Sequence, residues 1–346
     1  MILSMPSSHR PEAQQRPVSA AQDAHDVPRL LADVGGTNAR FALETAPGRI
    51  EHSATLACAD YPLLADAVAA YLGRQAGVKV RHAVIAIANP VDGDVIAMTN
   101  HHWRFSIQAT RIVLGLQTLL VVNDFAALAA SLPTLAEHEL TSVGNGTAQE
   151  NATIGLLGAG TGLGVAGLVR CGGTWEVLPS EGGHVAFAPM DAREAAILAF
   201  CWQRYPHVST ERLVSGPGLV LIHEALAAQH GQAWTPVTSA QIIEQGLSNS
   251  APLSRETLEC FCAMLGTAAA NLAVTLNARG GIYIGGGIVP RLGAWFAASP
   301  FRARFENKGR FSPFTAQLAT RVITAPYPAL AGAAALLEQH LAQVSA

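Results

Sequence analysis

The sequence has little charge, few aromatic side chains and few cysteines for its length. Of 346 residues, 14% are charged, 6% are aromatic and 50% are hydrophobic. Lys and Arg number 22 against 25 Asp and Glu, and we find no basic cluster, so nucleic acid is not an expected partner. The abundant hydrophobic residues favour large buried cores of tightly packed α/β layers.

The five cysteines do not suggest a disulfide framework. Their number is odd, and Cys260 and Cys262 form an isolated C-x-C pair, which is too little for a zinc site. We therefore expect reduced thiols and a cytoplasmic protein. The apolar runs at 82–91 and 324–336 are shorter than the ~20 residues of a membrane-spanning helix, so no membrane partner is expected.

The first 27 residues lack the marks of a folded or targeting segment. They are rich in Ser, Gln, Ala and Pro, without the basic start and apolar stretch of a secretory signal. We expect 1–27 to be a disordered leader that is dispensable. At ~100–200 residues per domain the length predicts two domains. The polar, glycine-containing stretch at 133–152 is the candidate boundary.

Apolar runs separated by turn signals predict the order of strands and helices. Strands are expected at 30–34, 39–44, 82–88, 118–122, 153–158, 164–169 and 281–284, and helices at 59–76, 125–132, 191–204, 217–230, 239–246, 255–276 and 329–344. The segments 30–44 and 154–169 share one plan: apolar strand, glycine turn with a Gly-Thr step, apolar strand. This repeat predicts two similar halves that face a common cleft.

Three glycine-rich turns after predicted strands are candidate nucleotide-binding segments. Segment 33–38 combines a carboxylate, a ligand for Mg²⁺, with a turn whose amides suit phosphate. Segment 160–162 is followed by β-favouring residues, which excludes a dinucleotide fingerprint because that motif needs a helix there. The glycines at 285–287 permit a flat ligand such as adenine to lie against the backbone. Ordinary hairpins and tight turns are the alternatives.

Two polar constellations are candidates for substrate chemistry. Asn123 and Asp124 follow a buried strand and precede a helix, where a carboxylate can accept a proton from an attacking hydroxyl; helix capping is the alternative. Glu181, His184 and Glu211 offer carboxylates and an imidazole that can bind several sugar hydroxyls. A metal site is the competing interpretation, but no H-E-x-x-H helix supports it.

Together and in this order, the segments resemble the bacterial glucokinases of the hexokinase–actin–Hsp70 superfamily, from about Leu30 to about Leu341. The signatures are LADVGGTNARFAL, AIANPVDGDVIAMTNHHWRFS, VVNDFAALA, GAGTGLGVA, PSEGGHVAFAP, ERLVSGPGL and GGGIVPRL. The cysteine-rich C-x-C-G-x-x-G-C motif of the related ROK family is absent. Ala32 and Ser180 stand where glycine is usual or common in the family.

The resemblance implies a two-domain ribonuclease-H-like (actin-like ATPase) α/β fold with an interdomain cleft and a mixed five-stranded sheet in each domain. The small domain would comprise 28–134 plus 325–346, and the large domain 135–324. The implied activity is transfer of the γ-phosphoryl group of ATP, delivered with Mg²⁺, to the 6-hydroxyl of glucose. A homodimer is the usual assembly of the family.

The resemblance also assigns roles to residues. Asp124 matches the catalytic base, and Asp33 would hold Mg²⁺ directly or through water. The residues that match glucose contacts are Asn123, Asp124, Glu181, His184 and Glu211. Those that match ATP contacts are Ala32, Asp33, Val34, Gly35, Gly36, Thr37, Gly160, Thr161, Gly162, Gly285 and Gly286.

Three other functions are weighed against this one. A kinase for another hexose, such as mannose or fructose, would share the motifs. A non-catalytic sugar-sensing regulator normally needs a helix-turn-helix, which a short leader containing prolines cannot supply. An actin-like or chaperone ATPase would not explain why Glu181, His184 and Glu211 converge.

Overall fold

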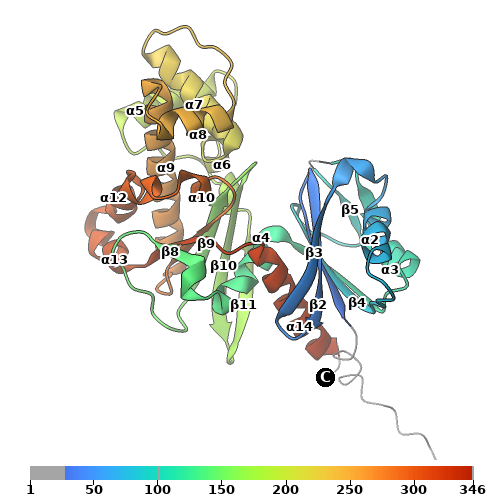
Figure 1. Ribbon diagram of the computed structural model, residues 1–346. Helices are drawn as coiled ribbons and strands as arrows, with labels where there is room; N and C mark the ends of the chain where they lie inside the picture. The colour runs from blue at the N-terminus through green and yellow to red at the C-terminus, as the bar shows by residue number, and fades with distance from the viewer. Residues whose placement is uncertain (1–27, 100, 345–346) are drawn as a thin grey trace, which may run out of the picture.

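The computed structural model describes residues 28–99 and 101–344, and the expected leader at 1–27 lies outside them. Figure 1 shows two lobes, each built on one β-sheet, with α4 (Asp124–Ser131) at their junction. We call the lobe that contains the N-terminal sheet the first lobe and the other the second lobe. This arrangement confirms the two-sheet α/β fold, while the division of the chain at 134/135 and 324/325 stays a prediction.

The sheet of the first lobe has the order β3-β2-β1-β4-β7. Strands β1, β4 and β7 run parallel, and β2 and β3 extend the sheet as antiparallel hairpins. The strands are β1 (Arg29–Val34), β2 (Asn38–Ala46), β3 (Arg49–Ala57), β4 (His82–Ile87) and β7 (Thr118–Asn123), with a small hairpin of β5 (Val95–Ala97) and β6 (Arg104–Ser106) beside them.

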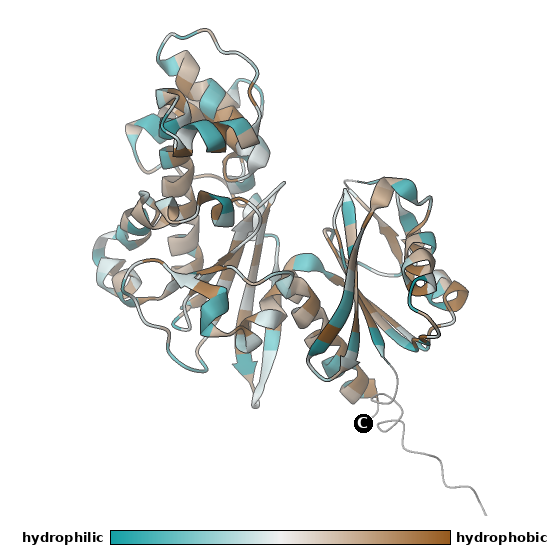
Figure 2. Ribbon diagram, viewed as in Figure 1, coloured by the Kyte–Doolittle hydropathy of each residue, from teal (hydrophilic) through white to brown (hydrophobic). Residues whose placement is uncertain are grey.

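Helices cover both faces of this first sheet, which explains why β4 is buried along its whole length. One face carries α2 (Leu64–Gly73) and α3 (Ile107–Val113). The other carries α4 and the C-terminal α14 (Pro328–Val344), which is largely hydrophobic in Figure 2. A helix expected over 59–76 is shorter, because Pro62 holds Tyr61 extended and only a short 3₁₀ turn, η1 (Cys58–Asp60), precedes α2.

The sheet of the second lobe repeats the plan of the first, in the order β11-β10-β9-β12-β13-β8. The hairpins β9-β10-β11 are antiparallel, and β12 and β13 run parallel to β9. The repeat predicted from 30–44 and 154–169 is therefore confirmed. The strands are β8 (Leu140–Ser142), β9 (Ile154–Ala159), β10 (Leu163–Cys171), β11 (Thr174–Ser180), β12 (Ile282–Gly285) and β13 (Thr320–Ile323).

The expectation of five strands in each sheet is wrong for the second lobe, which has a sixth. Strand β8 pairs antiparallel with β13 at the edge of the sheet, inside the stretch 133–152 that is the candidate domain boundary and for which we predicted no strand. It is three residues long and largely exposed, so it leaves no apolar pattern in the sequence.

The helices of the second lobe pack on its sheet and on one another around the largest hydrophobic core. They are α5 (Ala192–Trp202), α6 (Thr210–Leu213), α7 (Gly216–Gln229), α8 (Ser239–Leu247), α9 (Pro252–Leu276), α10 (Val289–Leu292), α11 (Trp295–Ala298), α12 (Phe301–Glu306) and α13 (Ser312–Gln317). Among the described residues, α9 alone is long and apolar enough to cross a membrane, and 72% of its apolar window is buried inside this core.

Helix α4 packs against both lobes. Ala127 belongs to the core between α14 and the first sheet, whereas Leu128 and Ala129 belong to the core on the second sheet. The contact with α14 is close: a Cβ atom on Gly332 would lie 1.7 Å from the carbonyl oxygen of Ala127 and 2.7 Å from the amide nitrogen of Ser131. The two helices can approach this closely only because residue 332 has no side chain.

We predict that Gly332→Ala lowers the free energy of unfolding, by about 1–3 kcal/mol, because its Cβ would push α14 away from the α4 backbone. Gly73→Ala is the matched control, since a Cβ there meets nothing within 4 Å. It should be neutral or stabilising by up to about 1 kcal/mol, the helix-propensity difference between Gly and Ala. Urea denaturation measures both. Equal stability of Gly332→Ala and wild type would show that the helices are not packed this closely.

Candidate active site

The carboxyl ends of the parallel strands in the first sheet bring together residues that are distant in sequence. Val34 of β1 lies beside Ile87 of β4, which lies beside Asn123 of β7. The Asn123 side chain donates to the carbonyl of Asn89 (3.3 Å), and its Oδ1 accepts from the amides of Phe125 and Ala126 at 2.9 and 3.1 Å. Asn123 therefore caps α4, as the alternative interpretation predicted, and thereby places Asp124 in its first turn.

Asp124 is a partly buried carboxylate at this junction. Burial, together with the negative charge of Asp33, raises its pKa to about 6. Hydrogen bonds from the Phe125 amide (2.8 Å) and the Asn123 side chain (3.1 Å) oppose that rise and hold the carboxylate in place. A carboxylate with a pKa near neutrality has the basicity that a general base needs.

Asp33 lies on β1 directly opposite Arg40 on β2, and Arg40 Nη1 donates to Asp33 Oδ2 at 3.2 Å. Burial raises the pKa of Asp33, whereas the Arg40 charge and hydrogen bond lower it. The predicted phosphate turn follows, with Ala32 and Val34 buried in β1 and Gly35, Gly36 and Thr37 in the turn to β2. Our sequence reasoning missed Arg40, although the hairpin register pairs it with Asp33.

The other two glycine segments lie at one edge of the second sheet. Gly160, Thr161 and Gly162 form the turn between β9 and β10. Gly285 ends β12, the parallel neighbour of β9, and Gly286 follows it. A Cβ on Gly158 would lie 2.5 Å from the carbonyl carbon of Gly285, and one on Gly286, whose φ is +79°, would lie 2.4 Å from the Ala159 oxygen. Only glycine permits this approach, so the structure brings the two predicted nucleotide segments together.

Glu181, His184 and Glu211 converge, as predicted. His184 Nε2 lies 3.9 Å from Glu181 Oε2, and its Nδ1 lies 3.9 Å from Glu211 Oε1. Glu181 precedes the 3₁₀ turn η4 (Gly182–His184) after β11, and His184 is the last residue of that turn. Their side chains are 67% and 61% exposed, so they remain open to a ligand. Glu211, on α6, is 31% exposed and accepts from the Leu163 amide at 2.8 Å.

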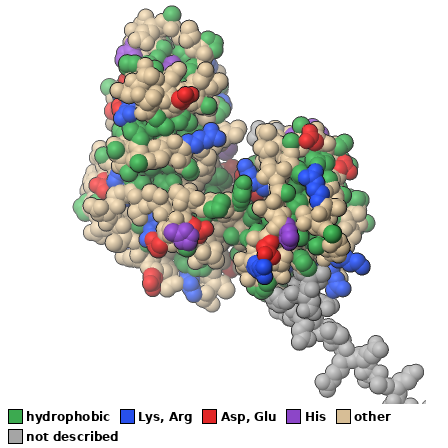
Figure 3. Space-filling model, viewed as in Figure 1, with side chains coloured by type: hydrophobic (Ala, Val, Ile, Leu, Met, Phe, Trp, Pro, Cys, Tyr) green, Lys and Arg blue, Asp and Glu red, His purple; other side chains and the backbone are tan. Residues whose placement is uncertain are grey.

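The segment 162–164 connects this cluster to Asp124. A Cβ on Gly162 would lie 2.4 Å from Glu211 Oε2, and one on Gly164 would lie 2.1 Å from the Phe125 ring, next to Asp124. The carbonyl of Gly160 accepts from the Gly216 amide at 2.8 Å, a contact that sequence reasoning missed. The glycine turn therefore touches the Glu–His cluster on one side and the start of α4 on the other. Figure 3 shows the surface hollowed between the two lobes.

Two sheets of repeated topology, with glycine turns at their strand ends and a carboxylate between them, define the sugar-kinase class of the actin-like ATPase fold. A glucokinase from an Antarctic psychrotroph superposes with a TM-score of 0.82 at 37% identity, covering 90% of this chain and 99% of that one.

The chain belongs to the glucokinase family, whose model matches residues 30–340. It is 55% identical to the glucokinase of Chromobacterium violaceum over 315 residues, 91% of this chain and 90% of that protein. It is also 55% identical over 330 residues to the bifunctional protein glk of Burkholderia pseudomallei, covering 95% of this chain but 51% of that protein. The chain thus spans about half the length of such bifunctional relatives.

We predict that Asp124→Asn stabilises the fold at alkaline pH. The pKa of Asp124 in the folded protein is about 6, above the ordinary value of 3.8, so the folded state favours the protonated carboxyl group. Its contribution to the free energy of unfolding is therefore present at low pH and is lost as pH rises through about 6. At pH 8 the ionised Asp124 carboxylate lowers the free energy of unfolding by an amount on the order of 1–3 kcal/mol. Urea denaturation should show a gain of that order at pH 8 and little change at pH 4.

The exposed Asp92→Asn is the control and should show no such difference between the two pH values. If Asp124→Asn is no more stable than wild type at pH 8, burial does not raise the pKa of Asp124 as described.

Proposed function

We propose that this protein is an ATP-dependent glucokinase, which transfers the γ-phosphoryl group of ATP to the 6-hydroxyl of glucose. The observation that carries the proposal is the position of Asp124, a carboxylate with a pKa near 6 beside a turn that also contacts Glu211. Membership of the glucokinase family and the similarity to the Chromobacterium violaceum protein support the choice of substrate.

In the proposed reaction, Asp124 accepts the proton of the 6-hydroxyl as that oxygen attacks the γ-phosphorus. Asn123 and the Phe125 amide hold the carboxylate in place. Glu181, His184 and Glu211 bind hydroxyls at the far end of the ring and so orient the sugar. Phosphoryl transfer depends mainly on such positioning and on charge neutralisation, rather than on covalent chemistry with the protein.

The ATP side of the proposed site comprises the turn 35–37, the turn 160–162 and the glycines at 285–286, whose backbone amides suit phosphate and nucleotide. The residues present fit a magnesium ion: Asp33 is an oxygen donor of the kind Mg²⁺ prefers, and its charge is only partly offset by Arg40. Mg²⁺ bound with ATP would neutralise phosphate charge. A homodimer and a cytoplasmic location are further parts of the proposal: the first rests on the family alone, and the second on the cysteines, which do not suggest a disulfide framework.

The direct test of this proposal is a coupled assay of the purified protein with ATP and a panel of hexoses. We expect glucose to be the best substrate and glucose 6-phosphate the product. Asp124→Asn should lower kcat by about 10²–10⁴-fold, the usual contribution of a general base, while glucose binding persists. A near-wild-type kcat would show that Asp124 is not the general base and only caps or packs the helix. A preference for mannose or fructose would show that glucose is not the main substrate.

A matched pair of glycine variants should separate the nucleotide side from the sugar side. A Cβ on Gly160 meets nothing within 4 Å, so Gly160→Ala should crowd only bound ATP and raise KM for ATP. A Cβ on Gly162 would lie 2.4 Å from Glu211 Oε2, so Gly162→Ala should displace Glu211 and raise KM for glucose as well. One lost hydrogen bond to a charged group corresponds to about 10–150-fold in affinity.

Steady-state kinetics with each substrate varied in turn measures this separation. If Gly160→Ala raises KM for glucose but not for ATP, the turn serves the sugar and the assignment of the two sides is wrong.

A further inference from the structure

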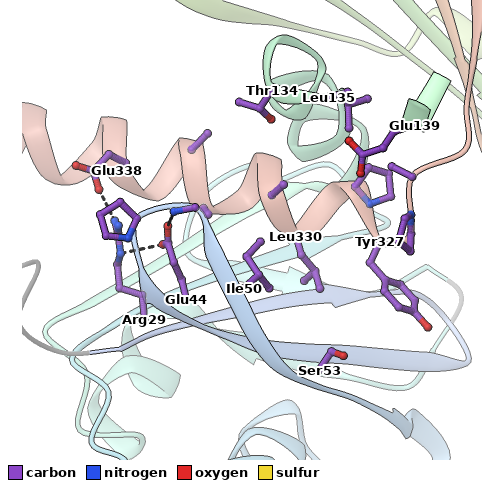
Figure 4. Close-up of a pocket in the computed structure, with 18 residues that line it drawn as sticks. Arg29, Glu44, Ile50, Ser53, Thr134, Leu135, Glu139, Tyr327, Leu330 and Glu338 are labelled. Carbon is purple, nitrogen blue, oxygen red and sulfur yellow. Dashed lines mark hydrogen bonds and ion pairs between the residues drawn. The ribbon is translucent and has the colours of Figure 1, made fainter. Parts of the chain in front are cut away.

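Two networks of polar side chains in the first lobe lie outside the proposed reaction. One lines a cavity of about 660 Å³ between α14 and the β2–β3 hairpin, where Glu44 pairs with Arg29 at 3.0 Å and accepts from the Gly48 amide at 2.9 Å (Figure 4). Arg29 begins β1, so this network lies at the edge of the sheet opposite the candidate site. The other network surrounds Asn89 and lies at the same edge as Asp124.

Asn89 is half-buried in the loop that follows β4, at the carboxyl end of the parallel strands. The amide of Ala88 donates to the Val34 carbonyl at 3.2 Å, which keeps the start of this loop beside β1. Asn89 belongs to the signature AIANPVDGDVIAMTNHHWRFS, from which the proposed reaction uses no side chain. Its side chain is therefore a candidate for a further role at the site.

The side chain of Asn89 is bonded to the segment at the end of β5. Its Oδ1 accepts from the amide and the hydroxyl of Thr99 at 2.8 and 2.9 Å, and its Nδ2 donates to the Ala97 carbonyl at 3.1 Å. Because Ala97 is the last residue of β5, these three bonds fasten residue 89 to the β5–β6 hairpin. An asparagine amide with two donors to its oxygen and an acceptor for its nitrogen has one favourable orientation, so the bonds fix the backbone at this position.

The backbone carbonyl of Asn89 in turn binds the cap of α4. It accepts from Asn123 Nδ2 at 3.3 Å, and the same nitrogen donates to Asp124 Oδ1 at 3.1 Å. Asn123 Oδ1 accepts from the amides of Phe125 and Ala126. An asparagine side chain has two donor hydrogens and two acceptor lone pairs, so all of its bonds are made only in this orientation. The Asn89 carbonyl thus helps to aim the other hydrogen of Asn123 at Asp124.

We propose that Asn89 is a positioning residue for phosphoryl transfer: it holds the Asn123 amide, which in turn holds the Asp124 carboxylate. This inference rests on the proposed role of Asp124 as the general base. Such positioning matters because a misplacement of about 1 Å in a catalytic site can lower the rate by about 10²-fold. An asparagine that only stabilised the loop would affect the free energy of unfolding, without a selective effect on kcat.

Steady-state kinetics of Asn89→Ala with glucose tests the proposal. Alanine removes the three side-chain bonds but keeps the backbone carbonyl, and kcat should fall by about tenfold or more as Asp124 loses its fixed position. KM for ATP should not change, because the Asn89 side chain bonds only to Ala97 and Thr99 among the described residues. A folded Asn89→Ala protein with wild-type kcat overturns the proposal.

Asp94→Asn is the matched control. Asp94 accepts from the Ser106 hydroxyl at 2.5 Å and from the Gln108 amide at 2.9 Å, so it fastens the same hairpin at the start of α3, away from Asn123. Its kcat should be that of wild type. An equal fall of kcat in Asp94→Asn would show that any loosening of the hairpin impairs turnover, and would overturn the specific role of Asn89.

A double-mutant cycle tests whether Asn89 acts through Asn123. In Asn123→Ser the serine still caps the helix but has no amide to contact Asn89 and Asp124. Adding Asn89→Ala to this variant should change kcat by less than about twofold, because the link is already broken. A further tenfold fall would show that Asn89 acts independently of Asn123 and would overturn the proposal.

NMR of the Asn123 side-chain amide, assigned by its absence in Asn123→Ser, tests the placement without substrate. Exchange of its hydrogens with solvent should be at least about tenfold faster in Asn89→Ala than in wild type or Asp94→Asn. Unchanged exchange in Asn89→Ala overturns the inference. Since this measurement needs no turnover, it decides the inference even if the wild type phosphorylates no hexose, a result that would refute only the proposed function.

Discussion

The packing of α4 between two sheets is the constraint on which the arrangement of the site depends. One side of the helix lies against α14 and the first sheet through Ala127, and the other lies against the second sheet through Leu128 and Ala129. At the two places where a neighbouring element comes closest to α4, the residue of that neighbour is a glycine: Gly332 of α14 and Gly164 of β10. Because α4 begins at Asp124, the contacts that join the lobes also place this carboxylate between them.

The same burial that joins the lobes gives Asp124 its chemistry. Desolvation by the surrounding protein and the nearby Asp33 charge disfavour the ionised form, while the cap at Asn123 and the amide of Phe125 orient it. Because the ionised form of Asp124 is destabilised in the folded protein, ionisation lowers the free energy of unfolding, and the same destabilisation makes the carboxylate a stronger base. Arg40 limits that cost at Asp33, because its guanidinium offsets the neighbouring negative charge.

Much of the fold was predictable because its signals are local. Apolar runs marked the central strands, and the Gly-Thr turns revealed the repeat of the two hairpins. Edge strands gave no such signal: β8 is short and β3 (RIEHSATLA) is mostly polar and partly exposed. In the site, the glycine turns and Asn123-Asp124 come directly after predicted strands, and this place in the sequence was enough to identify them as candidates. Arg40 required the hairpin register, and the contact of Gly216 with Gly160 joins segments far apart in sequence, which no local pattern reports.

The central claim is that burial and the Asp33 charge make Asp124 a base near neutral pH. Carbon-13 NMR titration of the Asp124 carboxyl carbon, assigned by comparison with Asp124→Asn, measures this directly. The account predicts an apparent pKa of about 6 in the wild type, shifted down in Asp33→Asn because one negative charge is removed. A wild-type pKa near the ordinary 3.8, unchanged in Asp33→Asn, would contradict it.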